Sequence, residues 1–144
     1  MKTVAQLLTS KQKQNLYTIA PHSTVDDALS LMALRNIGAL PVVEDGRLTG
    51  IVSERDYVRK VNRHGHSAND LQVADIMSSP VLTVDPKQTI RECMALFTSR
   101  FLRHLPVVDG GQLIGMLSIG DIVKAMIAEQ DQLIEQLEQY IRGH

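Results

Sequence analysis

The chain has 144 residues and a mass of 16.0 kDa, which suits one domain or two small modules that share a core. Hydrophobic residues make up 44% and charged residues 22%, which excludes a mainly disordered chain. A net charge of -1 and the absence of Trp argue against a DNA-binding module with a basic face. No apolar run approaches the ~18 residues of a membrane span and no leader is visible, so we expect no membrane partner and a cytoplasmic location.

The first predicted element is a short helix over Val4–Leu8, followed by a brief extended segment that ends at Thr18. A longer helix is then expected after Thr24. Thr24 and Asp27 have the spacing of a capping box, in which a hydroxyl and a carboxylate satisfy the first backbone N–H groups of a helix.

Two short apolar strands follow, with the sequences ALPVVE and LTGIVS. Asp45 and Gly46 stand between them and favour the positive φ angles of a tight hairpin turn. A second helix is expected to begin beside Ser53. The polar stretch 61–70 then reads as a linker.

The second half of the chain repeats this order. Residues 18–60 align without a gap with residues 83–125, at a constant offset of 65 and with fifteen identical pairs. A fainter match relates 4–11 to 73–80 at an offset of 69. Each unit of about 60 residues would be marginal alone, so we expect a tandem duplication that shares a core. The predicted fold class is α/β (α+β), built twice.

In the second unit, one face of the predicted helix is apolar at helical spacing, and its members are Ile90, Cys93, Met94, Phe97 and Phe101. This placement predicts that Cys93, the single cysteine, is a buried and inert thiol rather than a nucleophile.

Two motifs occur in both units. Leu-Pro-Val-Val occupies 40–43 and 105–108. One explanation of its proline is that it makes the start of the strand rigid. The other is that it leaves nearby backbone groups unpaired, so that they can bind a ligand. Gly-x-x-Ser-x-x-Asp places Ser53 with Asp56, and Ser118 with Asp121. One explanation is a helix cap with an acidic residue in the first turn. The other is a site that offers hydroxyl and N–H groups to a phosphate and a carboxylate to a ribose.

The doubled pattern of these motifs, with Asp-Gly or Gly-Gly between the strands, resembles the cystathionine-β-synthase-type (CBS) domain pair, or Bateman module, in its stand-alone form. The resemblance implies β-α-β-β-α repeats with pseudo-two-fold symmetry and two clefts between them. It places the first repeat at 1–62, the linker at 63–70, the second repeat at 71–128 and a helical extension at 129–144. Such clefts commonly take AMP, ADP, ATP, NAD(H) or S-adenosylmethionine, so a nucleotide ligand is expected and no cofactor is required.

Carried over by position, the resemblance implies ribose contacts for the two aspartates and ribose or phosphate contacts for the two serines. Base or ribose contacts are expected along the extended entries and the proline-containing strands. Cations for phosphate differ between the units, because Arg103 and His104 correspond to Gly38 and Ala39, and Arg55 corresponds to Gly120. The expected ligand-binding residues are Thr18, Gly38, Ala39, Pro41, Ser53, Arg55, Asp56, Thr83, Arg103, His104, Pro106, Ser118 and Asp121.

The remaining candidates are weaker. His64 and His66 in the linker lack a nearby carboxylate or thiol pair and are interpreted as solvated, so no metal site is expected. His22 has no identifiable partner. No catalytic motif of a hydrolase, zinc protease or phosphate-binding loop is visible, so an enzyme is not expected.

The tail from Asp121 to Ile141 is predicted to be one long helix with an apolar stripe, formed by Val123, Met126, Ile127, Leu133, Ile134, Leu137, Tyr140 and Ile141. The stripe needs a cover, either the chain's own surface or another copy, and a homodimer through helices and tail is favoured. Two functions remain open: a non-catalytic sensor that passes nucleotide binding to an unknown regulated protein, and a structural oligomerisation or adaptor protein.

Overall fold

The computed structural model describes residues 2–10, 16–61 and 69–143. It divides into two compact units. The unit called here the N-unit comprises Asn15–Leu82 with Asp109–Ile114, and the C-unit comprises Met1–Gln14, Thr83–Val108 and Gly115–His144. Most of the predicted linker, with His64 and His66, lies outside the described residues.

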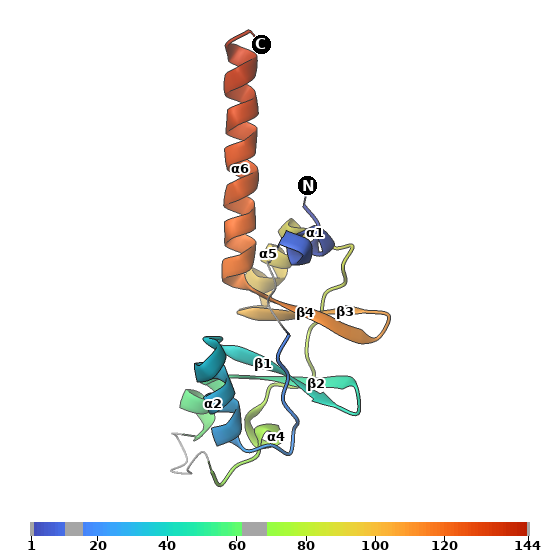
Figure 1. The fold of residues 1–144 in the computed structure, drawn as a ribbon, viewed down its shortest axis with the longest axis vertical. Helices are drawn as coiled ribbons and strands as arrows, with labels where there is room; N and C mark the ends of the chain where they lie inside the picture. The colour runs from blue at the N-terminus through green and yellow to red at the C-terminus, as the bar shows by residue number, and fades with distance from the viewer. Residues whose placement is uncertain (1, 11–15, 62–68, 144) are drawn as a thin grey trace. The chain divides into compact units, whose positions relative to one another are not determined.

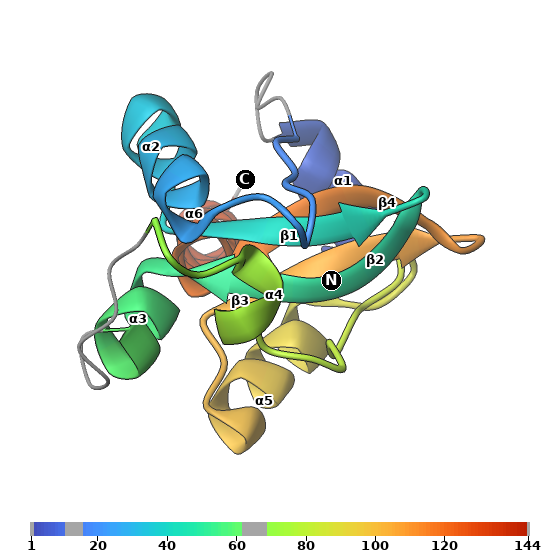
Figure 2. The same ribbon diagram turned by 90° about the horizontal axis from the view of Figure 1, so that it is seen from below.

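The N-unit is built on an antiparallel hairpin of β1 (Ala39–Glu44) and β2 (Arg47–Ser53). The helix α2 (Val25–Arg35) precedes the hairpin, and the short α3 (Glu54–Asp56) with the π-helical turn η1 (Tyr57–Val61) follows it. The helix α4 (Val73–Ile76) completes the unit (Figures 1 and 2).

The second half of the chain repeats the arrangement with α5 (Ile90–Arg100), the hairpin strands β3 (His104–Asp109) and β4 (Gln112–Ser118), and α6 (Ile119–Ile141). These elements belong to the C-unit, except for Asp109–Ile114 of the hairpin. The helix α1 (Val4–Ser10) belongs to this unit. The mixed helix and strand fold and its duplication are therefore confirmed, with one small antiparallel sheet in each repeat.

The predicted caps and turns are confirmed by the backbone. At α2, Thr24 Oγ1 accepts from the Asp27 N–H at 3.0 Å, which is the hydroxyl half of the expected capping box. Helix α5 begins with a complete, reciprocal capping box formed by Thr89 and Glu92. The hairpin turns have positive φ angles, 51° and 78° at Asp45 and Gly46, and 58° and 84° at Gly110 and Gly111. Asp and Gly tolerate this conformation, which explains why these residues stand between the strands.

The leading helix of each half of the sequence packs on the unit formed by the other half. In the C-unit, the N–H groups of Val4 and Ala5 donate to the carbonyls of Gln88 and Pro86 at 2.8 and 2.9 Å. In the N-unit, Val73 and Ala74 donate in the same way to Ser23 and Pro21, at 2.8 and 2.9 Å. The two units therefore have equivalent backbone hydrogen bonds to a leading helix. In each unit that helix comes from the other half of the sequence.

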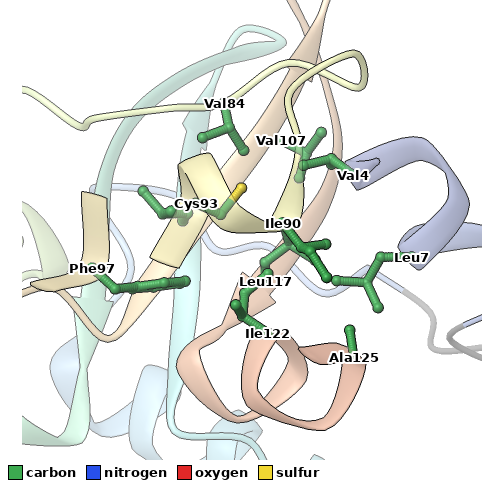
Figure 3. Close-up of a cluster of buried hydrophobic side chains, with 11 residues drawn as sticks. Val4, Leu7, Val84, Ile90, Cys93, Phe97, Val107, Leu117, Ile122 and Ala125 are labelled. Carbon is green, nitrogen blue, oxygen red and sulfur yellow. The ribbon is translucent and has the colours of Figure 1, made fainter. Parts of the chain in front are cut away.

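Each unit has its own aliphatic core. The core of the C-unit joins α1, α5, the hairpin and α6 (Figure 3), and it contains Val4, Leu7, Val84, Ile90, Cys93, Phe97, Leu105, Val107, Leu117, Ile122 and Ala125. The core of the N-unit contains Val25, Ala28, Met32, Leu40, Val42, Val52, Val73 and Ile76. Helix α4 supplies the last two of these, as α1 supplies Val4 and Leu7 to the C-unit.

The prediction that Phe101 shares the buried face of its helix is wrong. Helix α5 ends at Arg100, and Phe101 is the C-cap with φ 54° and a side chain 92% exposed. A left-handed residue turns the chain away from the helix, so its side chain leaves the apolar face. The equivalent residue in the first repeat is Asn36, which adopts φ 55°.

Cys93 is fully buried, as predicted, and its environment makes the thiol a poor nucleophile. Burial, with a smaller contribution from the Glu92 carboxylate, raises the pKa of the Cys93 thiol from 9.0 to about 11.

The raised pKa of Cys93 predicts a loss of stability in alkali. Between pH 9 and 11 the unfolded thiol loses its proton while the folded thiol keeps it, so the free energy of unfolding falls as pH rises. The loss approaches roughly 2–3 kcal/mol by pH 11. Urea unfolding of wild type and Cys93→Ala from pH 8 to 11 measures it. Equal pH slopes in the two proteins would show that Cys93 contributes nothing.

Candidate functional site

The second helix of each repeat begins with a serine and an aspartate that cap each other. In the N-unit, Asp56 Oδ2 accepts from the Ser53 N–H at 2.9 Å and from Ser53 Oγ at 2.9 Å. The Asp56 N–H donates back to Ser53 Oγ at 3.2 Å. In the C-unit, Ser118 N–H donates to Asp121 Oδ2 at 2.8 Å, and Asp121 N–H to Ser118 Oγ at 3.1 Å. Both carboxylates are half-buried and fixed at a helix N-terminus, where the backbone dipole favours negative charge.

The loop before each proline-containing strand is tied to the same helix start. The Gly38 carbonyl accepts from the Glu54 N–H at 3.1 Å, and the Arg103 carbonyl accepts from the Ile119 N–H at 3.0 Å. Ala39 also lies opposite Ser53 in the β1–β2 register. The structure therefore brings the loop residues and the capped helix start together in both units.

The extended entry of each repeat contacts its strand at a single residue. Ile19 N–H donates to the Pro41 carbonyl at 3.1 Å, and Val84 N–H donates to the Pro106 carbonyl at 3.0 Å. Thr18 directly precedes the first of these contacts. The first strand of each predicted β-α-β-β-α repeat is thus a parallel bridge rather than a strand. Proline has no N–H, so its carbonyl alone takes part in this bridge.

The expected site residues divide between the two units as the repeat predicts. Those in the N-unit are Thr18, Gly38, Ala39, Pro41, Ser53, Arg55 and Asp56, and those in the C-unit are Thr83, Arg103, His104, Pro106, Ser118 and Asp121. The prolines are buried, whereas the side chains of Arg55 and Arg103 are exposed and His104 is half-buried. The two arginines therefore lie at the surface of their units, at different positions in the two repeats.

The glycine of the Gly-x-x-Ser-x-x-Asp motif is explained by packing. A Cβ at Gly50 would lie 2.6 Å from Met77 Sδ and 2.9 Å from the Ser78 carbonyl oxygen. A Cβ at Gly115 would lie 2.8 Å from Leu8 Cδ2. Gly50 thus leaves space for the two residues that follow α4, and Gly115 leaves space for Leu8 of α1.

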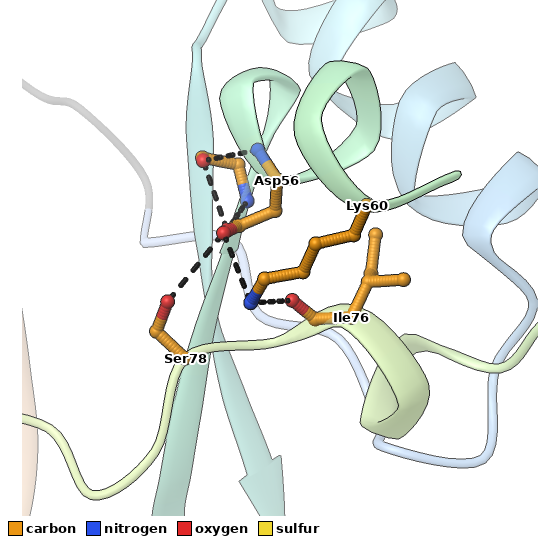
Figure 4. A network of polar contacts seen from close by, with 5 residues as sticks. Asp56, Lys60, Ile76 and Ser78 are labelled. Atoms are coloured by element: carbon orange, nitrogen blue, oxygen red, sulfur yellow. Dashed lines mark hydrogen bonds and ion pairs between the residues drawn. The ribbon is translucent and has the colours of Figure 1, made fainter. Parts of the chain in front are cut away.

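Two residues at the N-unit site were missed by sequence reasoning. Asp56 Oδ1 lies 3.4 Å from Ser78 Oγ and 3.5 Å from Lys60 Nζ, and Lys60 Nζ donates to the Ile76 carbonyl at 2.8 Å (Figure 4). The sequence offered one signal for Ser78, which is that the fainter repeat aligns it with Thr9, so both repeats have a hydroxyl residue at this position. Lys60 stands one helical turn after Asp56, a spacing at which side chains meet.

Among the described residues, no helix combines the length and the apolar character that crossing a bilayer requires.

Comparison with known proteins agrees with the duplicated fold. The CBS domain profile matches residues 4–63 and 73–128. A CBS domain-containing protein of Arabidopsis thaliana mitochondria, CBSX3, is 37% identical over 149 residues, covering 98% of this chain and 72% of the relative.

Solved structures match over most of the chain. A putative signal-transduction protein with CBS domains from Burkholderia ambifaria is 49% identical with a TM-score of 0.86, over 90% of this chain and 96% of that one. CBSX2 in complex with AMP is 30% identical with a TM-score of 0.72, over 90% and 99%. A hexameric CBS-CP12 protein from bloom-forming cyanobacteria is 32% identical with a TM-score of 0.74, over 84% and 70%. With both halves matched by the same profile, the chain belongs to the CBS domain family and carries two CBS domains in tandem.

Proposed function

We propose that this chain is a non-catalytic regulatory sensor that binds an adenosine-containing ligand at the capped helix starts of its two units. The observation that carries the proposal is the duplicated serine–aspartate pair, held beside a proline-containing strand in both units. The AMP complex of CBSX2, a related CBS protein, supports an adenine nucleotide as the ligand class. AMP and NAD(H) are the favoured candidates, followed by ADP, ATP and S-adenosylmethionine.

Each aspartate is suited to hold the two hydroxyls of a ribose. A carboxylate offers about four acceptor positions, and each of these two is fixed in place by the serine N–H three residues before it. Hydrogen bonds from hydroxyls to an ionised carboxylate are among the stronger ones in proteins. Asp56 and Asp121 therefore serve as the ribose acceptors, with Ser53 and Ser118 holding them in place.

Phosphate groups on the ligand need cations, and the two units supply them differently. Arg103 and His104 precede the proline-containing strand of the C-unit, where the N-unit has Gly38 and Ala39. Arg55 lies beside Asp56 in the N-unit. The two sites are therefore expected to differ in their preference for ligands of different phosphate charge.

Calorimetric titration of the full chain with AMP, ATP, NAD(H) and S-adenosylmethionine tests the proposal. At least one ligand should bind with a dissociation constant below ~1 mM, corresponding to about 4 kcal/mol of binding free energy. Weaker binding by all four would refute it. If chromatography after incubation detects conversion of the nucleotide, the proposal that the chain is non-catalytic is wrong.

Regulation requires that ligand and partner favour the same conformation of the chain. A ligand shifts such an equilibrium only by the difference between its affinities for the two states. The regulated partner is accordingly a protein whose affinity for this chain changes when the nucleotide binds.

A structural adaptor is the alternative function. The observation in its favour is that the serine–aspartate pairs also act as ordinary capping boxes, which need no ligand. An adaptor would bind its partner equally well with and without nucleotide.

Self-association through α6 is part of the proposal. Ile122 and Ala125 face the core of the C-unit, whereas five apolar side chains in the last turns are 52–81% exposed, namely Leu133, Ile134, Leu137, Tyr140 and Ile141. Gln132, Gln136 and Gln139 line one edge of this stripe, and Glu138 and Asp131 lie toward the other edge. A contiguous apolar stripe that is exposed in this way is typical of an interface between copies of a chain. A second copy is therefore the proposed cover.

Replacing Leu133 and Leu137 together by glutamine should weaken this self-association at least about 100-fold, because each copy would lose two apolar anchors. Sedimentation equilibrium measures the change. The matched control is Glu135→Gln with Glu138→Gln, which alters charged residues of the same turns and should leave the dimer intact. If the wild-type chain is a monomer, the proposed self-association is wrong. If the leucine variant associates as strongly as wild type, the interface does not include α6.

A further inference from the structure

The two residues beside Asp56 Oδ1 have different equivalents in the second repeat. Asp56 has Lys60 and Ser78 beside Oδ1, at 3.5 and 3.4 Å. The residue equivalent to Lys60 is Ala125, which is buried in the C-unit core. The residue equivalent to Ser78 is Thr9, whose hydroxyl donates to the Ala5 carbonyl at 3.0 Å. A lysine one turn after the aspartate is therefore a property of the N-unit site.

Lys60 is held at the carboxylate and remains accessible. Its Nζ donates to the Ile76 carbonyl at the end of α4 at 2.8 Å, and the lysine side chain is 44% exposed against 14% for Asp56 (Figure 4). An ammonium group has three donors. Two are directed at Ile76 and Asp56, and the exposure of the side chain makes it available to an incoming ligand.

Both oxygens of Asp56 are engaged before any ligand arrives. Oδ2 accepts from the N–H and the hydroxyl of Ser53, which hold the helix cap. Oδ1 faces Ser78 and Lys60. A ribose hydroxyl that binds this carboxylate must therefore compete with Ser78 and Lys60 for Oδ1.

We propose that Lys60 is a specificity-determining residue of the N-unit site, which makes the site favour phosphate-bearing adenosine ligands over uncharged nucleosides. The inference rests on the proposed function. When an uncharged nucleoside displaces the Lys60 ammonium from Asp56, the ammonium has no other anion to pair with. A phosphorylated ligand supplies one, because the flexible lysine stem allows the ammonium to turn from the carboxylate to a phosphate oxygen. In the C-unit this discrimination depends on Arg103 and His104 instead.

The test compares the dissociation constants of adenosine and AMP by calorimetry in the full chain. All variants carry Asp121→Ala, which weakens the C-unit site so that the titration reports binding at the N-unit site. Lys60→Met should narrow the adenosine-to-AMP ratio about three- to tenfold, since a partly exposed cation is screened by solvent. Lys60→Arg should keep the ratio. The matched control is Arg59→Met, which removes an exposed cation from the neighbouring position of the same helical turn and should also keep it.

Each result decides the question. A ratio that Lys60→Met leaves unchanged, or that Arg59→Met narrows equally, would overturn the role of Lys60 while leaving nucleotide binding intact. AMP binding by wild type but none by the Asp121→Ala chain would show that the N-unit holds no site. Failure of wild type to bind AMP and the other adenosine ligands would instead overturn the proposed function. Thermal melting without ligand shows whether each variant is folded.

Discussion

Replacing Phe97 by alanine should lower the free energy of unfolding by about 3–5 kcal/mol, the usual cost of emptying a buried aromatic position. Phe97 is 2% exposed and stands among the largest buried side chains of the C-unit core. Its ring lies in the cluster that joins α5 to the hairpin and α6 (Figure 3). Urea unfolding followed by circular dichroism measures the loss.

The matched control for this change is Phe101→Asn. Phe101 is 92% exposed in a left-handed conformation, and Asn is the residue that occupies the equivalent C-cap in the first repeat. Asparagine tolerates positive φ better than phenylalanine does, so this variant should be as stable as wild type or more stable. A loss as large as that of Phe97→Ala would contradict the described end of α5.

Replacing Asp121 by alanine should cost about 1.5–3 kcal/mol of nucleotide affinity at the C-unit site, because a charged acceptor for the ribose hydroxyls is lost. Asp56→Ala should have the same effect at the N-unit site. Calorimetry with AMP resolves the two contributions when the single variants are compared with the double variant.

The aspartates also cap their helices, so a stability effect must be separated from a binding effect. Glu92 forms a capping box with Thr89 at the start of α5, outside the proposed sites. Glu92→Ala should lower stability by about 1 kcal/mol, as each aspartate variant does, and leave AMP affinity unchanged. If Glu92→Ala weakens AMP binding as much as Asp121→Ala, the ribose assignment is wrong.

Local signals in the sequence predicted much of the fold. The cap at Thr24 and the Gly-containing turns between the strands depend on a few adjacent residues, so they can be predicted without knowing the tertiary structure. The same holds for the serine–aspartate caps at the candidate sites. Their expected role as ribose acceptors stays a prediction.

The features that were missed depend on contacts between distant segments. Helix α1 and residues 86–88 meet through backbone hydrogen bonds, which leave no mark in side-chain periodicity. The approach of Ser78 to Asp56 likewise follows from where α4 packs. Phe101 was assigned to the wrong face because helical periodicity gives no end point, although its alignment with Asn36 was an available signal.

The central claim is that the carboxylates of Asp56 and Asp121 hold the ribose diol of an adenosine ligand. Its most direct test compares AMP with 2′,3′-dideoxyadenosine monophosphate, titrated into wild type and into the Asp56→Ala/Asp121→Ala double variant. Loss of the diol should weaken binding to wild type at least about tenfold, and to the double variant no more than about twofold, since the partner of the diol is then already absent. An equal loss in both proteins would contradict the account.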